Sequence, residues 1–443
     1  MLNIVLVGNG AREHVMAEAL ATSPQRPHLF AYMKANNPGI AALAEQVRLG
    51  GYADTAAICD FALAAHASFA VIGPEDPLQH GVVDALATVG IPAVGPTHEL
   101  ARLETSKSFT RKLLAKYGIP GNPVFRSFTS LASIKEFLAG QEAVVLKPDG
   151  LTGGKGVLVQ GEHFTTTEEA ISRCEDILKE HPRVIIEERL DGEEFSLQCF
   201  CDGSTVIATP CVQDHKRRFP GDQGPNTGGM GSYSCPDHLL PFLQPEDVAM
   251  ALDITQRVAA ALRAETGSSY KGIMYGGFMI TGRGVKLLEY NARFGDPEAM
   301  NVLPLLETDF AAVCQAIVAG TLASCPVAFA HQATVCKYAV PKGYGLPPGH
   351  PDAASTSVPL TIGDVGRARL YFASVDKRGD TLYMTNSRAI GLVGIAPTLA
   401  EAEQIAEAAV SAISGPVDHR PDIGTESLIQ KRIAHMQRIR PAP

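Results

Sequence analysis

The sequence predicts a multidomain protein that combines the α/β and α+β classes. Its 443 residues correspond to three or four domains, at roughly 100–200 residues each. The first hundred residues alternate apolar strand-like runs with helical patterns, which indicates a doubly wound parallel sheet covered on both faces. After the breaker Gly118-Ile119-Pro120 the pattern changes to hairpins and longer helices, which is typical of α+β units.

The elements follow in order from hydrophobic period and breaker residues. In the N-terminal part, the predicted strands are 3–7, 69–73 and 91–95, and the predicted helices are 12–21, 81–89 and 99–117. A small α+β unit is predicted from strands 144–147, 157–160 and 184–188, a glycine loop over 150–156 and helix 167–179. A central part has strands 196–201, 276–280 and 286–290 with helices 244–265 and 309–319. A strand over 333–340, two further strand runs and a final helix over 398–413 predict a small C-terminal α+β domain.

Charge and hydropathy exclude several classes of function. The net charge of −9 and the pI near 5.8 disfavour a general nucleic-acid binder, which needs a basic surface. The chain does not open with the basic and apolar regions of a signal peptide. No run approaches the ~20 apolar residues of a membrane span. We therefore expect a protein without membrane or nucleic-acid partners.

The nine cysteines are odd in number and spread along the chain. The closest pair, Cys199 and Cys201, would share one face of a strand, and a zinc site there stays open as an alternative. No second pair or nearby histidine completes a four-ligand set, however. We interpret the cysteines as buried or ordinary thiols and expect a reducing compartment, the cytoplasm.

The first candidate site is Gly8-Asn9-Gly10-Ala11-Arg12-Glu13-His14, between a predicted strand and a predicted helix. Backbone N–H groups and the dipole at a helix N-terminus favour an anion, so the segment suits a phosphate. It is not a G-x-G-x-x-G dinucleotide fingerprint, because Glu13 replaces the third glycine. A tight turn without a ligand is the alternative.

The second candidate, Lys147-Pro148-Asp149-Gly150-Leu151-Thr152-Gly153-Gly154-Lys155-Gly156-Val157, joins two predicted strands. Glycines let the backbone approach phosphate oxygens and lysines neutralise their charge, which predicts a polyphosphate-binding hairpin. The spacing is not that of a Walker A loop, because no G-K-[S/T] opens a helix. A plain surface hairpin is the alternative.

The third candidate is an apolar strand that runs into an acidic connector, Val184-Ile185-Ile186-Glu187-Glu188-Arg189-Leu190-Asp191-Gly192-Glu193-Glu194. It is similar to a hinge whose backbone reads adenine and whose carboxylate meets ribose hydroxyls. A solvated acidic loop is the alternative for this segment taken alone.

The fourth candidate is Leu288-Glu289-Tyr290-Asn291-Ala292-Arg293-Phe294-Gly295-Asp296-Pro297-Glu298. In a strand, Glu289, Asn291 and Arg293 point the same way. The first two offer hard oxygens suited to Mg²⁺, and the arginine offers a fork for a carboxylate or phosphate. An exposed polar edge is the alternative.

The fifth candidate combines the basic run Gln213-Asp214-His215-Lys216-Arg217-Arg218 with the loop Gly224-Pro225-Asn226-Thr227-Gly228-Gly229-Met230-Gly231. Basic side chains beside a glycine-rich loop suit an anionic substrate. A solvated charge run with a flexible loop is the alternative.

Together and in this order, the five motifs resemble those of ATP-grasp enzymes, and among them the phosphoribosylamine–glycine ligase (glycinamide ribonucleotide synthetase) family. The resemblance covers essentially the whole chain. Besides the strings around Gly8, Asp214, Gly224 and Asn291, it includes Leu103-Glu104-x-Ser106-Lys107-x-Phe109-Thr110. It implies ligation of glycine to 5-phosphoribosylamine, with ATP and Mg²⁺ or Mn²⁺, through glycyl phosphate in de novo purine synthesis. The partners would be small molecules, and the protein a monomer or weak homodimer.

The resemblance also implies roles for individual residues. ATP would be bound by Lys107, Lys147, Gly153, Gly154, Lys155, Gly156, Glu187, Glu188, Leu190 and Glu194. The metal would be held by Glu289 and Asn291, and catalysis would involve Lys155, Asp214, Lys216 and Arg293. The amine and amino-acid substrates would meet Gly8, Asn9, Gly10, Glu13, Asn37, Pro38, Gly39, Asn226, Arg293, Gly295 and Asp296.

The implied domains are a Rossmann-like substrate domain (1–104), a central ATP-grasp domain (105–121 and 196–328), a lid subdomain (122–195) and a C-terminal domain (329–443). The sequence departs from the commonest bacterial pattern at 33–37, 337–345 and 385–389, and two of these departures lie in N- and C-terminal segments that would flank the amine. A sister ligase with another amine or amino acid is therefore the first alternative. A nucleotide-binding regulatory subunit without turnover is the second, and the intact lysines and Glu289/Asn291 pair argue against it.

Overall fold

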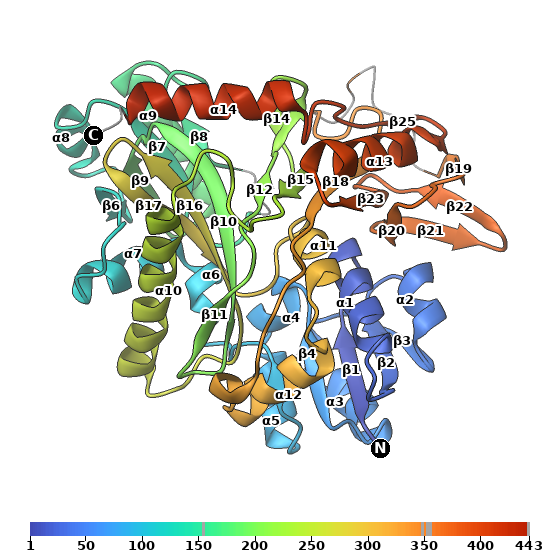
Figure 1. The fold of residues 1–443 in the computed structure, drawn as a ribbon. Helices are drawn as coiled ribbons and strands as arrows, with labels where there is room; N and C mark the ends of the chain where they lie inside the picture. Colours follow the sequence, from blue (N-terminus) through green and yellow to red (C-terminus); the bar gives the residue numbers. More distant parts are fainter. Residues whose placement is uncertain (153–155, 347–349, 351–356, 441–443) are drawn as a thin grey trace.

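A five-stranded parallel sheet forms the N-terminal part of the molecule (Figure 1). The computed structural model describes residues 1–152, 156–346, 350 and 357–440. The strand order is β3-β2-β1-β4-β5, and every neighbouring pair is parallel, which confirms the predicted doubly wound class. The strands are β1 (Asn3–Val7), β2 (His28–Met33), β3 (Gln46–Leu49), β4 (Phe69–Ile72) and β5 (Ala93–Val94). The helices are α1 (Ala11–Ala21), α2 (Pro38–Leu43), α3 (Thr55–Ala64), α4 (Glu75–Gln79) and α5 (Val82–Thr88).

The single helix predicted over 99–117 is wrong. The chain forms α6 (Arg102–Thr105) and α7 (Lys107–Lys116), and Ser106 between them is extended at φ −140° and ψ 101°. The Ser106 hydroxyl accepts a hydrogen bond from the N–H of Phe109 and caps α7. A serine at an N-cap offers the backbone this alternative to a continuous helix.

A separate small sheet, β6-β9-β7-β8, carries two helices and has an apolar core of its own. We call this part (residues 125–188) the β6–β9 unit. Its elements are β6 (Phe125–Phe128), α8 (Ile134–Ala139), β7 (Val144–Pro148), β8 (Leu158–Val159), α9 (Thr167–Glu180) and β9 (Val184–Glu188). Gly153, Gly154 and Lys155 of the predicted glycine loop lie outside the described residues.

The central antiparallel sheet, β11-β10-β16-β17, packs against the long helix α10 (Pro245–Thr266). Its strands are β10 (Gly192–Cys201), β11 (Val206–Ala208), β16 (Gly272–Thr281) and β17 (Gly284–Asn291). Strands β12 (Gln213–Asp214) and β15 (Gly231–Ser234) pair into the next sheet, beside β18, and β13 (Arg217–Phe219) and β14 (Gln223–Asn226) form a two-stranded sheet of their own. The shorter helical elements are α11 (Ala299–Val302), η1 (Leu303–Leu305), α12 (Phe310–Ala319) and η2 (Leu322–Ser324). The described core residues of the N-terminal and central sheets belong to one continuous apolar cluster.

The C-terminal part is built on β18 (Ala333–Pro341) and β23 (Ile390–Ala396), which pair antiparallel and are covered by α13 (Leu399–Ser411). Its other strands are β19 (Pro359–Ile362), β20 (Arg369–Phe372), β21 (Val375–Arg378), β22 (Thr381–Met384), β24 (Ile413–Ser414) and β25 (Val417–Asp418).

The prediction that the helix near 398–413 is the last one is wrong, because α14 (Glu426–Ile439) follows it. Helix α14 extends away from α13 to pack on β10 of the central sheet (Figure 1). Arg432 of α14 pairs with Glu193 at 3.2 Å, and Arg440 donates to Asp247 at 2.8 Å. The C-terminal segment therefore ties two parts of the molecule together.

All nine cysteines are free thiols, and only Cys325 is more than slightly exposed. This confirms their interpretation as buried or ordinary thiols. Over the described ranges of the chain, none of the helices combines the length and the apolar character that crossing a membrane requires.

Candidate active site

Strand β17 carries the predicted metal pair, Glu289 and Asn291, on one face. Within the part of the chain that the structure describes, the Glu289 carboxylate makes no hydrogen bond or ion pair, whereas Asn291 Oδ1 accepts from Arg293 at 3.1 Å. Burial raises the pKa of Glu289, but facing cations outweigh burial and the pKa lies below its ordinary value. These cations are, in order of effect, Lys216, Lys107, Lys147 and Arg293.

The donor set of β17 fits a hard divalent cation that takes its remaining ligands from phosphates. A carboxylate without a protein partner and an amide oxygen two residues away are the ligands such an ion prefers. Among the described residues, no group of three or more His, Cys, Asp or Glu side chains could hold a metal by itself.

Lys147 enters the site from β7 and is fixed by a buried carboxylate. Its Nζ lies 2.8 Å from Glu187 Oε2 on β9 and 3.3 Å from the Leu288 carbonyl. Arg111 of α7 binds the same Glu187 with two nitrogens, at 2.7 and 3.0 Å. Burial opposes ionisation of Glu187, but Arg111 and then Lys147 outweigh it and hold its pKa at about 2.

Lys107 lies at the start of α7, and its Nζ donates to the Gly150 carbonyl at 2.9 Å. Burial lowers the pKa of Lys107 despite the facing Glu289. Lys107, Lys147 and Glu289 are thus close enough for their charges to act on one another. Their role in phosphoryl transfer stays a prediction. Gly156, at φ +88°, is the last residue of the predicted loop that the structure describes.

The predicted hinge has a different shape from the acidic connector expected. Glu187 and Glu188 both end β9, and Glu194 already lies in β10, so only 189–191 connect the two strands. Glu188 accepts from the N–H of Val124 at 3.0 Å and pairs with Arg283 at 2.6 Å. The carboxylates of Glu187 and Glu188 are both engaged with protein groups.

Glu194 is exposed on β10, and its carboxylate lies 3.3 Å from Lys216 Nζ. Lys216 also lies 3.9 Å from Asp214. The charge of Glu194 is the largest influence on Lys216 and raises its pKa well above the ordinary value, against burial. Lys216 therefore stays a cation between the hinge strand and the Asp214 side of the site.

Asp214 is a side chain whose Oδ1 is buried without a hydrogen-bond partner among the described residues. Burial, and then the nearby Glu298, raise its pKa well above the ordinary value. Glu298 accepts from the Tyr275 hydroxyl at 2.5 Å and from Ser196 at 3.3 Å. Glu298 was not among the predicted site residues, although it closes the motif that contains Asn291.

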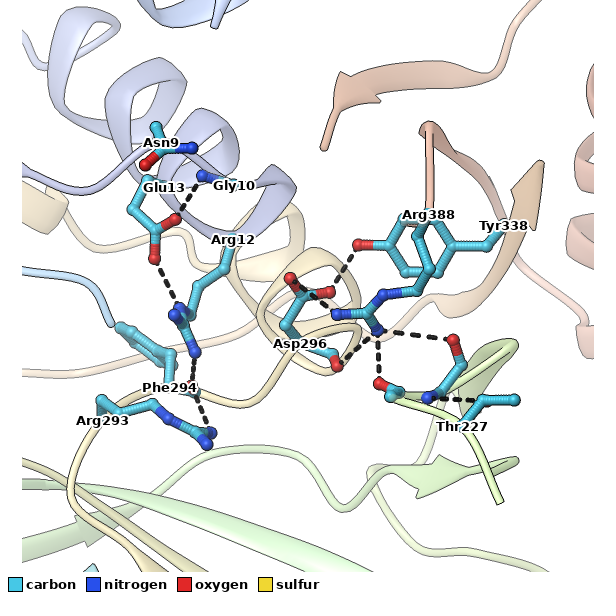
Figure 2. Close-up of polar contacts among 12 residues, drawn as sticks. Asn9, Gly10, Arg12, Glu13, Thr227, Arg293, Phe294, Asp296, Tyr338 and Arg388 are labelled. Carbon is cyan, nitrogen blue, oxygen red and sulfur yellow. Dashed lines mark hydrogen bonds and ion pairs between the residues drawn. The ribbon is translucent and has the colours of Figure 1, made fainter. Parts of the chain in front are cut away.

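The first-motif loop is shaped by Glu13, which lies beneath it and is 2% exposed. Its carboxylate accepts from the N–H of Gly10 at 2.5 Å and from Arg12 Nε at 2.5 Å (Figure 2). Gly8 has φ +140°, and a Cβ there would lie 2.3 Å from Glu13 Cγ, so the position requires glycine. The N–H of Gly10, the N-cap residue of α1, is therefore already paired with the Glu13 carboxylate. Contact between Glu13 and a substrate stays a prediction.

Asn37 joins three segments from two parts of the molecule and is fully buried. Its Oδ1 caps α2 through the N–H groups of Gly39 and Ile40, and its Nδ2 donates to the Asn9 carbonyl at 3.0 Å and to the Phe372 carbonyl at 2.7 Å. Pro38 begins α2. Asn37 and Pro38 thus support the Asn9 loop from behind.

Gly39 allows His14 to pack against α2, because a Cβ at position 39 would lie 1.9 Å from the His14 ring. His14 packs between Tyr371 and Phe372 of the C-terminal part, with ring centroids at 5.4 and 5.8 Å. Burial lowers the pKa of His14 to about 4, so the ring is neutral at pH 7.

Arg293 ties the central part to the N-terminal part. It donates to Glu75 at 3.1 Å and lies 2.8 Å from Glu104. Burial opposes its charge, but Glu104 and then Glu75 raise its pKa above the ordinary value. Neither glutamate was predicted as a site residue, since nothing local in the sequence links them to a distant arginine.

Gly295 and Asn226 take different places. The N–H of Gly295 donates to Gln198 at 2.7 Å beside the buried Glu298. Asn226 ends β14 and pairs with Arg217 of β13. Asn226 makes none of the described contacts with the Glu289 group, so its predicted substrate role stays a prediction.

Asp296 lies between the N-terminal loop and the C-terminal sheet (Figure 2). Its carboxylate accepts from the Tyr338 hydroxyl and lies 3.3 Å from Arg388 Nη2. Both partners fall in segments that depart from the commonest bacterial pattern, and neither was predicted as a site residue.

Two family models match this chain over adjoining spans. Residues 2–104 match the phosphoribosylglycinamide synthetase N domain, and residues 105–299 match the phosphoribosylglycinamide synthetase ATP-grasp (A) domain. Together these spans cover more than half of the 443 residues. The chain belongs to the phosphoribosylamine–glycine ligase family. The resemblance inferred from the five motifs is thereby confirmed.

Relatives in the phosphoribosylamine–glycine ligase family match along their full length. The phosphoribosylamine–glycine ligase of Methanosarcina barkeri is 47% identical over 99% of this chain and 100% of its own. That of Methanoregula boonei is 48% identical over the same shares. The crystal structure of the Thermotoga maritima phosphoribosylamine–glycine ligase has a TM-score of 0.79 at 26% identity, covering 95% of this chain and 100% of its own. The ATP-grasp domains of this family use ATP with a divalent metal ion.

Proposed function

We propose that the protein ligates glycine to 5-phosphoribosylamine, giving glycinamide ribonucleotide, ADP and phosphate in de novo purine synthesis. The observation that carries the proposal is the full-length identity to phosphoribosylamine–glycine ligases. The grouping of Lys107, Lys147 and Lys216 around Glu289 supports it. A site that faces one carboxylate with several cations suits the transfer of a phosphoryl group between anions.

The proposed reaction has two steps that balance separately. A glycine carboxylate oxygen attacks the γ-phosphorus of ATP, the bond to the β,γ-bridging oxygen breaks, and ADP leaves. The amine nitrogen of phosphoribosylamine then attacks the glycyl carbonyl, phosphate leaves, and the nitrogen loses a proton. Activation is needed because a carboxylate has no adequate leaving group for an amine.

The proposed roles follow the geometry of the charged side chains. Lys107 and Lys147 would bind ATP phosphates, and Lys155 would join them from the glycine loop. Glu289 and Asn291 would hold Mg²⁺ or Mn²⁺, which when bound neutralises charge on the phosphates. Lys216 and Arg293 would orient the acyl group, and the buried Asp214 would meet the glycine ammonium. Adenine would be read by the backbone of 187–190.

We also propose the domain division 1–104, 105–121 with 196–328, 122–195 and 329–443. The separate core of the β6–β9 unit supports the boundaries of the third part. The meeting point of the two family spans at 104 and 105 supports the first boundary. Cytoplasmic location and a monomer or weak homodimer complete the proposal. Cell fractionation and light scattering across protein concentrations test these two points.

Phosphate release with ATP, glycine and phosphoribosylamine, formed in the assay from ribose 5-phosphate and ammonia, tests the function. We expect release that depends on both glycine and the amine. Glu289→Gln should abolish it, whereas Asp253→Asn on the exposed side of α10 should not. Release with another amine or amino acid only would favour a sister ligase, and no release with any pair would favour a regulatory subunit.

Positional isotope exchange tests the order of the steps. ATP labelled at the β,γ-bridging oxygen should scramble its label when glycine is present, provided that the β-phosphate of bound ADP can rotate. The exchange should be run with and without a stable analogue of phosphoribosylamine. Absence of scrambling in both cases, with normal turnover, would contradict a reversible glycyl phosphate step.

A further inference from the structure

Two side chains of the C-terminal part reach the site, although no motif assigned them a role there. Tyr338 lies in β18, and Arg388 lies two residues before β23. Tyr338 is fully buried, and Arg388 is 15% exposed at its side chain. The guanidinium of Arg388 lies 4.6 Å from the centroid of the Tyr338 ring, so the two form one stacked pair.

Both members of the pair bind the carboxylate of Asp296 (Figure 2). The Tyr338 hydroxyl donates to Oδ1, and Arg388 Nη2 lies 3.3 Å from Oδ2. Arg388 Nη1 also donates to the Asp296 carbonyl at 3.0 Å. Each carboxylate oxygen therefore has its own donor, and rotation of the side chain would break one of the two contacts.

Arg388 holds the glycine-rich loop at the same time. Its Nη1 donates to the Gly228 carbonyl. Gly229 has φ +105°, and a Cβ there would lie 3.3 Å from Arg388 Nη1 and 2.8 Å from Asp214 Oδ1. A side chain at position 229 would thus collide with Asp214 and crowd Arg388, so the position requires glycine. Arg388 fixes the distance between the Asp296 and Asp214 sides of the site.

Asp296 faces the N-terminal loop. A Cβ built on Gly10 would lie 3.7 Å from Asp296 Oδ2, which places the carboxylate next to the segment proposed for the amine substrate. A carboxylate in this position can accept hydrogen bonds from ribose hydroxyls or from an amine. The region proposed for the substrate glycine, around Asp214 and Lys216, lies on the other side of the Gly228–Gly229 turn.

The two donors keep their protons over the working pH range. Burial, and then the charge of Asp296, raise the pKa of Tyr338 well above its ordinary value. Burial opposes the charge of Arg388, but Asp296 outweighs it and raises the pKa of the guanidinium. Tyr338 therefore keeps its proton and donates it to Asp296.

We propose that Tyr338 and Arg388 are positioning residues that fix Asp296 toward the amine substrate and so set the affinity for phosphoribosylamine. This inference rests on the proposed ligase function. It predicts that loss of the Tyr338 hydroxyl weakens recognition of the amine while ATP and glycine bind as before.

Tyr338→Phe removes one hydroxyl and keeps the ring. We expect KM for phosphoribosylamine to rise roughly tenfold, as for loss of a hydrogen bond to a charged group, with KM for ATP and for glycine little changed. Arg388→Lys keeps the charge but loses the fork to Gly228 and Asp296, so it should raise the same KM by more. Unfolding midpoints of all variants are measured in parallel.

Tyr371→Phe is the matched control. Tyr371 is also a buried tyrosine of the C-terminal part, and its hydroxyl donates to a carboxylate, Glu18, at 2.5 Å, away from Asp296. It should leave all three KM values unchanged. An unchanged KM for phosphoribosylamine in Tyr338→Phe would overturn the inference. An equal rise in the KM for ATP, or an equal effect in Tyr371→Phe, would also overturn it. If the wild type does not turn over these substrates, the proposed function itself fails.

Discussion

The β6–β9 unit and the rest of the molecule hold the site by different means. The unit has its own apolar core, and at the site it meets its neighbours through buried charged groups. One such joint is Glu187 with Arg111 of α7, where Lys147 of the unit itself also binds Glu187, and another is Asp149, which accepts from Ser106 and from the N–H of Ser108. The N-terminal and central sheets instead share one continuous core with β18 of the C-terminal part.

This difference separates the two halves of the proposed chemistry. The groups proposed for ATP lie where a unit with its own core meets its neighbour through ion pairs and hydrogen bonds rather than through a shared apolar core. The groups proposed for the amine lie where packed sheets meet and where Asn37, His14 and Arg388 tie distant segments together. Close-packed interfaces resist small displacements. We infer a mobile nucleotide side and a rigid amine side.

Breaking the charged joint should have the largest effect. Glu187→Gln leaves Arg111 and Lys147 buried with a neutral partner, and loss of one member of a buried ion pair costs about 3–5 kcal/mol. Urea unfolding at pH 7 measures the loss. Glu162→Gln is the control, because its pair with Arg217 is exposed and should be worth about 1 kcal/mol or less. Equal losses in both variants would contradict the importance of the joint.

The packed side should instead be sensitive to acid. The pKa of His14 is about 4 in the folded protein and about 6.5 when unfolded, so the unfolded state binds more protons between these values. The contribution of neutral His14 to the free energy of unfolding is fully present above pH 6.5. It should decrease by about 3 kcal/mol as the pH is lowered through 4. Urea midpoints at pH 7 and 4.5 measure this fall.

His14→Gln should lose part of the pH dependence. A residual slope is expected from His215, whose pKa burial lowers to about 3. The same change at the exposed His66 is the control and should keep the wild-type slope. A His14→Gln profile that matches the wild type would show that the buried ring does not govern acid stability.

Strand β17 contributes to both the nucleotide side and the amine side of the site. A substitution in it should therefore affect turnover more than folding. Asn291→Leu removes a proposed metal ligand and should lower turnover at limiting Mg²⁺ by about 100-fold, equivalent to roughly 2.7 kcal/mol. Asn291→Asp keeps a hard oxygen and should retain more activity. Near-normal activity of Asn291→Leu at limiting metal would remove Asn291 from the proposed metal site.

The smallest effect expected is a local change in dynamics. Binding of a non-hydrolysable ATP analogue should slow hydrogen exchange in β7, β8 and the segment that connects them. Exchange in β1 and β4 of the N-terminal sheet should stay the same. Equal slowing in both regions, or none at saturating analogue, would contradict a mobile nucleotide side.

Local patterns in the sequence were enough to predict the parallel sheet, the β7–β8 pair and strand β17. Apolar runs and glycine breaks encode these elements within a few residues. The sequence also holds a signal for α14, since Ile429, Ile433 and Met436 follow helical spacing. The break at Ser106 likewise had a signal, because serine favours helix N-caps.

The pairings that complete the site could not be predicted in this way. Glu187 lies 76 residues from Arg111 in the chain, and Asp296 lies 42 residues from Tyr338. Such contacts depend on how the sheets pack against one another. The local periodicity of apolar residues in the sequence does not encode this packing. The family resemblance supplied Asp296 but neither of its partners, because both lie where this sequence departs from the commonest bacterial pattern.

The hidden thiols have a practical consequence for spectroscopy. Eight of the nine cysteines are buried, and burial raises the pKa of thiols such as Cys174 and Cys211 to about 12. Maleimide dyes react with exposed thiolates, so the native protein should label slowly. Cysteines introduced at Lys135 on α8 and Asp60 on α3, both exposed, could then carry a donor and an acceptor fluorophore. Energy transfer between them would follow the β6–β9 unit in real time without removal of any native cysteine.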